Sequence, residues 1–352
     1  MSKQSSIHSY FQSMKKDGTV LEVNRFFYLK WTNMKRPDYQ AVWLSEAPSE
    51  INFIHEIRWS QVRPSHTFYL CGYFSDIQDK RFRIPQEKTY KNISFMKSHL
   101  QKNVRKQNDN LAISSAYHLI KLSITDFLRR LPVIMVEDSY LHESFTTLIW
   151  LMIAESSVDA FSIKKYMIEW LLGIVYVLTQ MTKDVIIHTE TCLISQKQII
   201  YFLDSIRDFE LHQKSILYSL LLRASYGGMS FDVHMFQQFA LIWKERFIQN
   251  PSIEHPILVH QMRIRPIQFF SVLPLELDDW DLTAIDFHCS TILEMIHKKY
   301  PDMEINTIKQ LIWFNYSSVN TRVEHTIYEP ELWRQIKKTV DRTQKYLLDS
   351  NY

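Results

Sequence analysis

Glycine is scarce in this chain of 352 residues, which has five, at positions 18, 72, 173, 227 and 228. Loops that cradle phosphate need several glycines at fixed offsets, so that backbone N–H groups can close around the ligand. Neither GxxxxGK[ST] nor GxGxxG is present, which excludes a P-loop NTPase and a Rossmann-type dinucleotide enzyme. The GxSxG nucleophile elbow of α/β-hydrolases is absent as well.

Cysteine is also rare, and Cys71, Cys192 and Cys289 lie far apart in the sequence. Their number and spacing argue against a disulfide framework and against a cysteine-based zinc cluster, and favour a reducing compartment. The polar N-terminus lacks the pattern of a signal peptide, so we expect a protein that is not secreted. The longest apolar stretch, residues 166–181, is interrupted by Glu169 and is shorter than the roughly 20 residues that cross a bilayer. It predicts a buried helix and no membrane partner.

Charge of one sign is not in excess either, because the net charge is only +3. Such a balance does not by itself imply a polyanionic partner, and any nucleic-acid contact would have to come from a local patch. Apolar residues make up 46% of the chain, which is enough for a sizeable core at this length. We therefore expect a globular body.

The sequence pattern changes along the chain, from strand-like runs to helical spacing. Short runs of aromatic and β-branched residues, separated by turn formers, predict strands within residues 19–31, 39–46, 51–59 and 66–74. After about residue 92, apolar residues recur at three- and four-residue spacing, which predicts helices. These helices include residues 94–107, 110–122, 162–181, 195–209, 211–225, 232–249, 283–300 and 329–350. The expected fold class is α+β, mostly α: a small β-containing N-terminal region and then a large irregular helical array.

The predicted domain organisation has three parts. Residues 1–18 form a disordered tail, because they are mostly polar and end in the sequence KKDG. Residues 19–88 form the β-rich N-terminal region, and residues 89–352 form an α-helical domain.

Within the tail, Gln4, Ile7, Tyr10 and Phe11 stand at the spacing Q-x-x-[ILM]-x-x-[FYW]-[FYW]. This spacing resembles the PIP box, the short motif with which replication and repair proteins bind the sliding clamp PCNA. The resemblance covers residues 4–11 only, and implies a 3₁₀ turn that brings positions three and four apart onto one side. It also implies that Ile7, Tyr10 and Phe11 fill the hydrophobic pocket of the clamp, while the Gln4 amide occupies a small polar pocket beside it.

A basic segment offers a second candidate site. On a helix, Lys102, Arg105 and Lys106 occupy neighbouring positions of one face, from which they could contact successive phosphates. We include Lys97 from the same segment and the later pair Arg129 and Arg130 in a predicted DNA-binding set. The alternative is an ordinary solvated face that happens to be basic.

Acidic and histidine residues cluster twice, which raises the question of a divalent metal. Two-metal phosphoryl chemistry needs several carboxylates that converge on the ions, and these clusters could supply them if the fold joins them. Helix caps and surface carboxylates explain most of the same residues, so we expect no metal site and no cofactor. The clusters are Glu137, Asp138, His142 and Glu143, and then Glu276, Asp278, Asp279, Asp281, Asp286 and His288.

A polar tract at residues 312–325 contains Trp313 together with donors that suit phosphate or base contacts, Ser317, Ser318, Asn320 and Arg322. An ordinary turn between helices uses the same residue types. We keep both interpretations.

These observations predict a PCNA-binding accessory protein of DNA replication or repair, whose tail tethers a helical body to DNA or to another replication or repair protein. We expect it in the nucleus or at a site of DNA replication. One alternative is a metal-dependent, nuclease-like enzyme that the same tail recruits. Another is a helical scaffold in which the motif is coincidental and the tail packs on its own body. Whether the protein is an enzyme stays open, although HExxH and E-x-K patterns are absent too.

Overall fold

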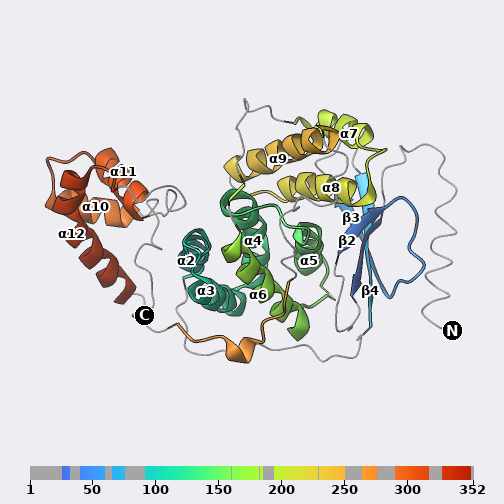
Figure 1. Cartoon of the computed structure of the whole chain (residues 1–352), viewed down its shortest axis with the longest axis horizontal. Helices are drawn as coiled ribbons and strands as arrows, with labels where there is room; N and C mark the ends of the chain where they lie inside the picture. The colour runs from blue at the N-terminus through green and yellow to red at the C-terminus, as the bar shows by residue number, and fades with distance from the viewer. Residues whose placement is uncertain are drawn as a thin grey trace. The chain divides into compact units, whose positions relative to one another are not determined.

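The computed structural model describes residues 26–31, 40–59, 66–75, 92–159, 161–181, 183–184, 194–228, 230–249, 264–275, 290–316 and 327–349 (Figure 1). These residues form one four-stranded sheet near the N-terminus and, after it, eleven α-helices. The predicted fold class, α+β and mostly α, is therefore confirmed.

Each predicted strand run contains one strand of the sheet. The strand order is β2-β1-β4-β3, in which β1 and β4 run parallel while β2 and β3 pair antiparallel at the two edges. Because β1 is joined in sequence to β2 and yet also pairs with β4, the sheet needs the whole stretch from β1 to β4. The bounds are β1 Phe26–Trp31, β2 Ala41–Leu44, β3 Phe53–Trp59 and β4 His66–Phe74.

The chain divides into two compact units, each built from separate stretches of sequence. The first comprises Met1–Arg81, Leu141–Ile163 and Ile186–His260, and the second comprises Phe82–Tyr140, Lys164–Val185 and Gln261–Tyr352. These units run across the predicted boundary at residue 88, because helices that follow it in sequence are grouped with the sheet.

In the first unit the helices are α5 (Phe145–Ser157), α7 (Gln196–Ser205), α8 (Leu211–Ser225) and α9 (Ser230–Gln249). In the second they are α2 (Ile93–Arg105), α3 (Asp109–Leu122), α4 (Ile124–Asp138), α6 (Lys165–Gln180), α10 (Ser290–Lys299), α11 (Ile305–Tyr316) and α12 (Pro330–Asp349). The helix ranges predicted from the sequence do not include α4, α5 or α11.

The core of the first unit lies on one face of the sheet. Side chains alternate between the faces of a strand, so Phe27 and Leu29 of β1 point to the same side, where both are fully buried. The Phe27 ring stacks on Trp43 of β2 with 4.5 Å between the ring centroids. The opposite face carries a smaller cluster around Phe26, Tyr28 and Cys71.

Helices α5 and α8 provide hydrogen-bond acceptors for the free edge of strand β2. Both helices lie beside the sheet in Figure 1. An edge strand exposes unpaired backbone groups, and β2 resolves this with side-chain hydroxyls. The backbone N–H of Ala41 donates to Thr147 Oγ1 at 2.9 Å, and that of Trp43 donates to Ser215 Oγ at 3.0 Å. The two hydroxyls thus close the β2 edge to further strands.

In the second unit, α2, α3 and α4 each begin at a side-chain cap. The side chains of Asn92, Asn108 and Ser123 accept hydrogen bonds from backbone N–H groups of the first turns of these helices. Helix α6 packs against α2 and α3. The segment 264–275, which includes the 3₁₀ turn η2 (Phe269–Ser271), contacts α6 where Gly173 allows its backbone to approach.

Helices α10, α11 and α12 pack on one another around a small apolar core. Each helix contributes residues at three- and four-residue spacing, as an amphipathic helix does when one face is buried. The core residues are Ile292, Leu293, Ile296, Ile308, Leu311, Ile312, Trp333, Ile336 and Val340.

Candidate functional site

The clamp-binding residues of the sequence prediction, Gln4, Ile7, Tyr10 and Phe11, lie outside the described residues. The structure therefore leaves that prediction as it stands. The acidic cluster 276–288 also lies outside the described residues, as do Ser317, Ser318, Asn320 and Arg322.

The predicted basic face of α2 is mostly occupied within the protein. Lys102 is 2% exposed and Arg105 is 9% exposed. Lys97 Nζ lies 2.9 Å from Asp126 Oδ1 on α4. Only Lys106, which caps the C-terminus of α2, is exposed in this group.

Arg105 belongs to a buried polar network that joins α2 to α4. Its Nε donates to Asp138 Oδ1, and its second guanidinium nitrogen lies 3.3 Å from Glu137 Oε1. Gln101 Nε2 donates to both carboxylates, at 2.9 Å for Glu137 and 2.6 Å for Asp138. Arg130 completes the network because its guanidinium donates to Gln101 Oε1.

The charges of this network influence one another strongly. Burial raises the pKa of the Glu137 carboxyl, and the neighbouring Asp138 raises it further, while Arg105 and Arg130 act in the opposite direction. A buried carboxylate pair of this kind needs its cations to stay in place. The network is therefore suited to holding α2 and α4 together.

The predicted DNA-binding residues differ in how exposed they are, and this decides which of them could contact DNA. In this conformation Lys102 and Arg105 do not reach solvent, so contact by either would require α2 to separate from α4. Lys106 and Arg129 are exposed and can reach a phosphate without such a change. For these two residues, DNA contact stays a prediction that the geometry permits.

The side chains of the first acidic cluster do not come together as a metal-binding group. Glu137 and Asp138 face Arg105 and Gln101, as described above. His142 Nδ1 instead accepts the backbone N–H of Ser144 at 3.1 Å. Over the described part of the chain, no group of three or more His, Cys, Asp or Glu side chains is placed to hold a metal ion. The metal-dependent alternative stays a prediction, to be tested by chelator-sensitive nuclease activity.

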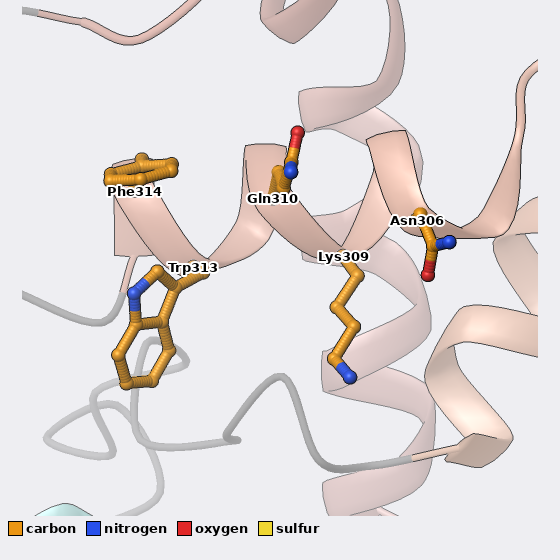
Figure 2. A pocket seen from close by; sticks show the side chains of 5 residues that line it. All are labelled: Asn306, Lys309, Gln310, Trp313 and Phe314. Atoms are coloured by element: carbon orange, nitrogen blue, oxygen red, sulfur yellow. The ribbon is translucent and has the colours of Figure 1, made fainter.

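A groove of about 460 Å³ runs along one side of α11 (Figure 2). Residues at offsets of three, four, seven and eight share one face of a helix, and the lining follows this spacing. The Phe314 ring packs on Tyr328 with 4.5 Å between the centroids, and both backbone polar groups of Tyr328 bond to the Asn315 side chain. The lining residues are Asn306, Lys309, Gln310, Trp313 and Phe314.

Trp313, a candidate residue from the sequence, lies on the last turn of α11 and lines this groove. An indole, an ammonium group and two amides along one face can stack on a flat apolar group and bond to its polar edge. In Figure 2 the Trp313 and Lys309 side chains extend in the same direction from α11. The groove is a candidate site for a small planar ligand or a side chain of a partner, without a feature that selects between them.

Among the described helices, none is long and apolar enough to cross a membrane. Comparison with known proteins adds no assignment. No model of a protein family, no curated protein and no solved structure matches this chain.

Proposed function

We propose that this protein binds the sliding clamp PCNA through residues 4–11 and acts as an accessory protein of DNA replication or repair. The observation that carries the proposal is the spacing of Gln4, Ile7, Tyr10 and Phe11 within a polar N-terminal segment. Two adjacent aromatic residues and one aliphatic residue are the kind of anchors that supply most of the affinity of a short peptide.

The position of the motif supports a tether. Phe11 precedes Phe26, the first residue of β1, by fifteen positions. A fully extended chain of that length spans at most about 50 Å. Residues 4–11 bound to the clamp would therefore keep β1 within that distance of residue 11. Such linkage raises the local concentration of the body without any need for tight binding of its own.

The direct test is calorimetric titration of a peptide spanning residues 1–18 into PCNA from the same organism. We expect micromolar binding that is lost when Ile7, Tyr10 and Phe11 are all replaced by alanine. A matched control peptide replaces Ser5, Ser6 and Ser9, which occupy the intervening positions, and should bind as tightly as the original. Absence of binding at high micromolar concentration, or equal loss in both variants, would refute the proposal.

A second measurement separates a tether from a segment that packs on its own body. The full chain and a chain without residues 1–18 should have the same melting temperature if the segment serves to bind a partner. A lower melting temperature after deletion would instead support the scaffold alternative, in which the aromatic residues belong to the core.

A further inference from the structure

Helix α12 has two contrasting faces. Trp333, Ile336 and Val340 are buried in the core that it shares with α10 and α11. The outer face is basic instead, with four exposed cations, Arg334, Lys338, Arg342 and Lys345. We call these four residues the α12 basic stripe.

The four cations form a continuous row. Their offsets of four, eight and eleven residues place them within an arc of about 80° around the helix axis, over a length of about 16 Å. The row therefore presents one positive charge for about every turn of the helix. The row becomes clear only once the structure shows which face of the helix is buried.

Within the described residues, no ion pair is recorded for any member of the stripe. On the same helix, Glu331 is exposed three residues before Arg334, and no ion pair between the two is recorded. Asp341, next to Arg342, is engaged by Lys337, whose Nζ lies 2.8 Å from Asp341 Oδ2. Asp341 also accepts a hydrogen bond from the hydroxyl of Tyr316 on α11. Its charge is thus already balanced, and the stripe stays positive.

We infer that the α12 basic stripe binds the phosphate backbone of duplex DNA. The duplex carries one negative charge for about every 1.7 Å of its axis, so several phosphates can lie along a row of this length. At least about half of all protein–DNA hydrogen bonds go to phosphate and sugar, with Arg and Lys among the main donors, so an exposed row of cations suits contact with the backbone. The inference rests on the proposed function in taking the polyanion to be DNA.

A membrane surface fits this helix less well. Helices that lie on membranes insert an apolar face between the lipids while their basic residues contact the headgroups. On α12 the apolar face is already buried against α10 and α11, and it is not available for insertion.

If each of the four cations contacts one phosphate, the salt dependence of DNA binding can be predicted. The logarithm of the binding constant should fall against the logarithm of salt concentration with a slope of about −3.6, at roughly 0.9 per contact. Raising the salt from 50 to 200 mM should then weaken binding on the order of a hundredfold. Contact of this kind is weak at physiological salt, which is why a tether to the clamp would matter.

The test uses the full chain and fluorescence anisotropy of a labelled duplex of random sequence at 50 mM salt. The variant Arg334→Gln, Lys338→Gln, Arg342→Gln and Lys345→Gln should bind at least about tenfold more weakly, with a slope shallower by about 3.6. A matched control neutralises four exposed cations outside α12 and outside the predicted DNA-binding set, Arg58, Lys183, Arg207 and Arg265. The control should lose much less affinity, and Lys338→Arg with Lys345→Arg should lose none.

Three results would overturn the inference. One is DNA binding by the stripe variant at wild-type strength. Another is an equal loss of affinity in the control, which would reduce the effect to net charge. The third is stripe-dependent binding to phosphatidylserine vesicles and not to DNA. Circular dichroism checks that each variant is folded.

Failure of the clamp proposal is distinguishable from failure of this inference. The full chain with Ile7, Tyr10 and Phe11 replaced by alanine should lose clamp binding and keep DNA binding. The stripe variant should show the reverse pattern. DNA binding that is lost in the motif variant and kept in the stripe variant would count against the stripe alone.

Discussion

Replacing Gly173 by alanine should destabilise the protein, although alanine is the better helix former. Gly173 lies inside α6, where the substitution would ordinarily gain about 1 kcal/mol. Here the new Cβ would overlap the carbonyl oxygen of Arg265 and lie 3.0 Å from Ile264 Cγ2. The closest atom belongs to the backbone, so it cannot be relieved by a side-chain rotation, and the segment 264–275 must move away.

The cost has two parts. Moving the segment weakens the hydrogen bond from the Ile267 backbone N–H to the carbonyl of Glu169, which measures 2.9 Å and contributes about 0.5–1.5 kcal/mol. Overpacking of a buried site costs about 1–3 kcal/mol. After the gain in helix propensity is subtracted, Gly173→Ala should lower the free energy of unfolding by about 0.5–3.5 kcal/mol.

Urea denaturation followed by circular dichroism measures the loss, and hydrogen exchange locates it. The amide of Ile267 should lose protection in the variant, since its acceptor lies on α6. A control, Glu245→Gly on the exposed side of α9, should cost about 1 kcal/mol from helix propensity alone. The reasoning is refuted if Gly173→Ala is as stable as wild type, or if the exchange of the segment 264–275 is unchanged.

Three other predictions concern contacts that tie elements together. Ser215→Ala leaves the buried N–H of Trp43 without its acceptor and should cost about 1–3 kcal/mol, measured by urea denaturation. Arg105→Met leaves the 4% exposed Asp138 without its cation and should cost about 3–5 kcal/mol in the same assay. Asp126 is partly buried, which raises its pKa, but hydrogen bonds from Lys97 and Ser123 lower the pKa overall. Its contribution is therefore present above the ordinary aspartate pKa of about 3.9, and is lost as the pH falls through the lowered folded-state pKa.

The first two variants each have a matched control, and Asp126→Asn tests the third prediction. Ser156→Ala removes a helix hydroxyl that bonds only to its own helix and an exposed neighbour, so its effect should stay within about 0.5 kcal/mol. Arg129→Met removes an exposed guanidinium from α4 and should cost far less than Arg105→Met. Asp126→Asn should flatten the acid limb of the stability curve and cost at most about 1 kcal/mol at pH 7, because the pair with Lys97 is partly exposed. Equal effects in a variant and its control would contradict the prediction concerned.

Several elements were predictable because their side-chain pattern is local. The four strands show the aromatic and β-branched runs that pair into a sheet, and each lies within its predicted range. Helix α12 shows apolar residues at three- and four-residue spacing against a polar face, which is a pattern that only a helix with one buried face produces. The fold class follows from these local signals.

Helix α5 was not singled out because it has no polar face to reveal its period. Every residue from Phe145 to Ala154 is buried, so the sequence there is apolar or small on all sides. Helix α11 was not recognised for another reason: its last turn was grouped with the polar residues that follow Tyr316.

The sequence by itself determined the element types, the fold class and the spacing of Gln4, Ile7, Tyr10 and Phe11, because each depends on residues close together in the chain. Only the tertiary structure decided which cations are available to a partner. Arg105 is buried because α4 packs on α2 and brings Glu137 and Asp138, more than thirty residues later in the chain, against it. The α12 basic stripe is exposed because α10 and α11 cover the opposite face of α12. Periodicity shows that a helix has faces, but the neighbour that covers each face is set by packing between distant segments.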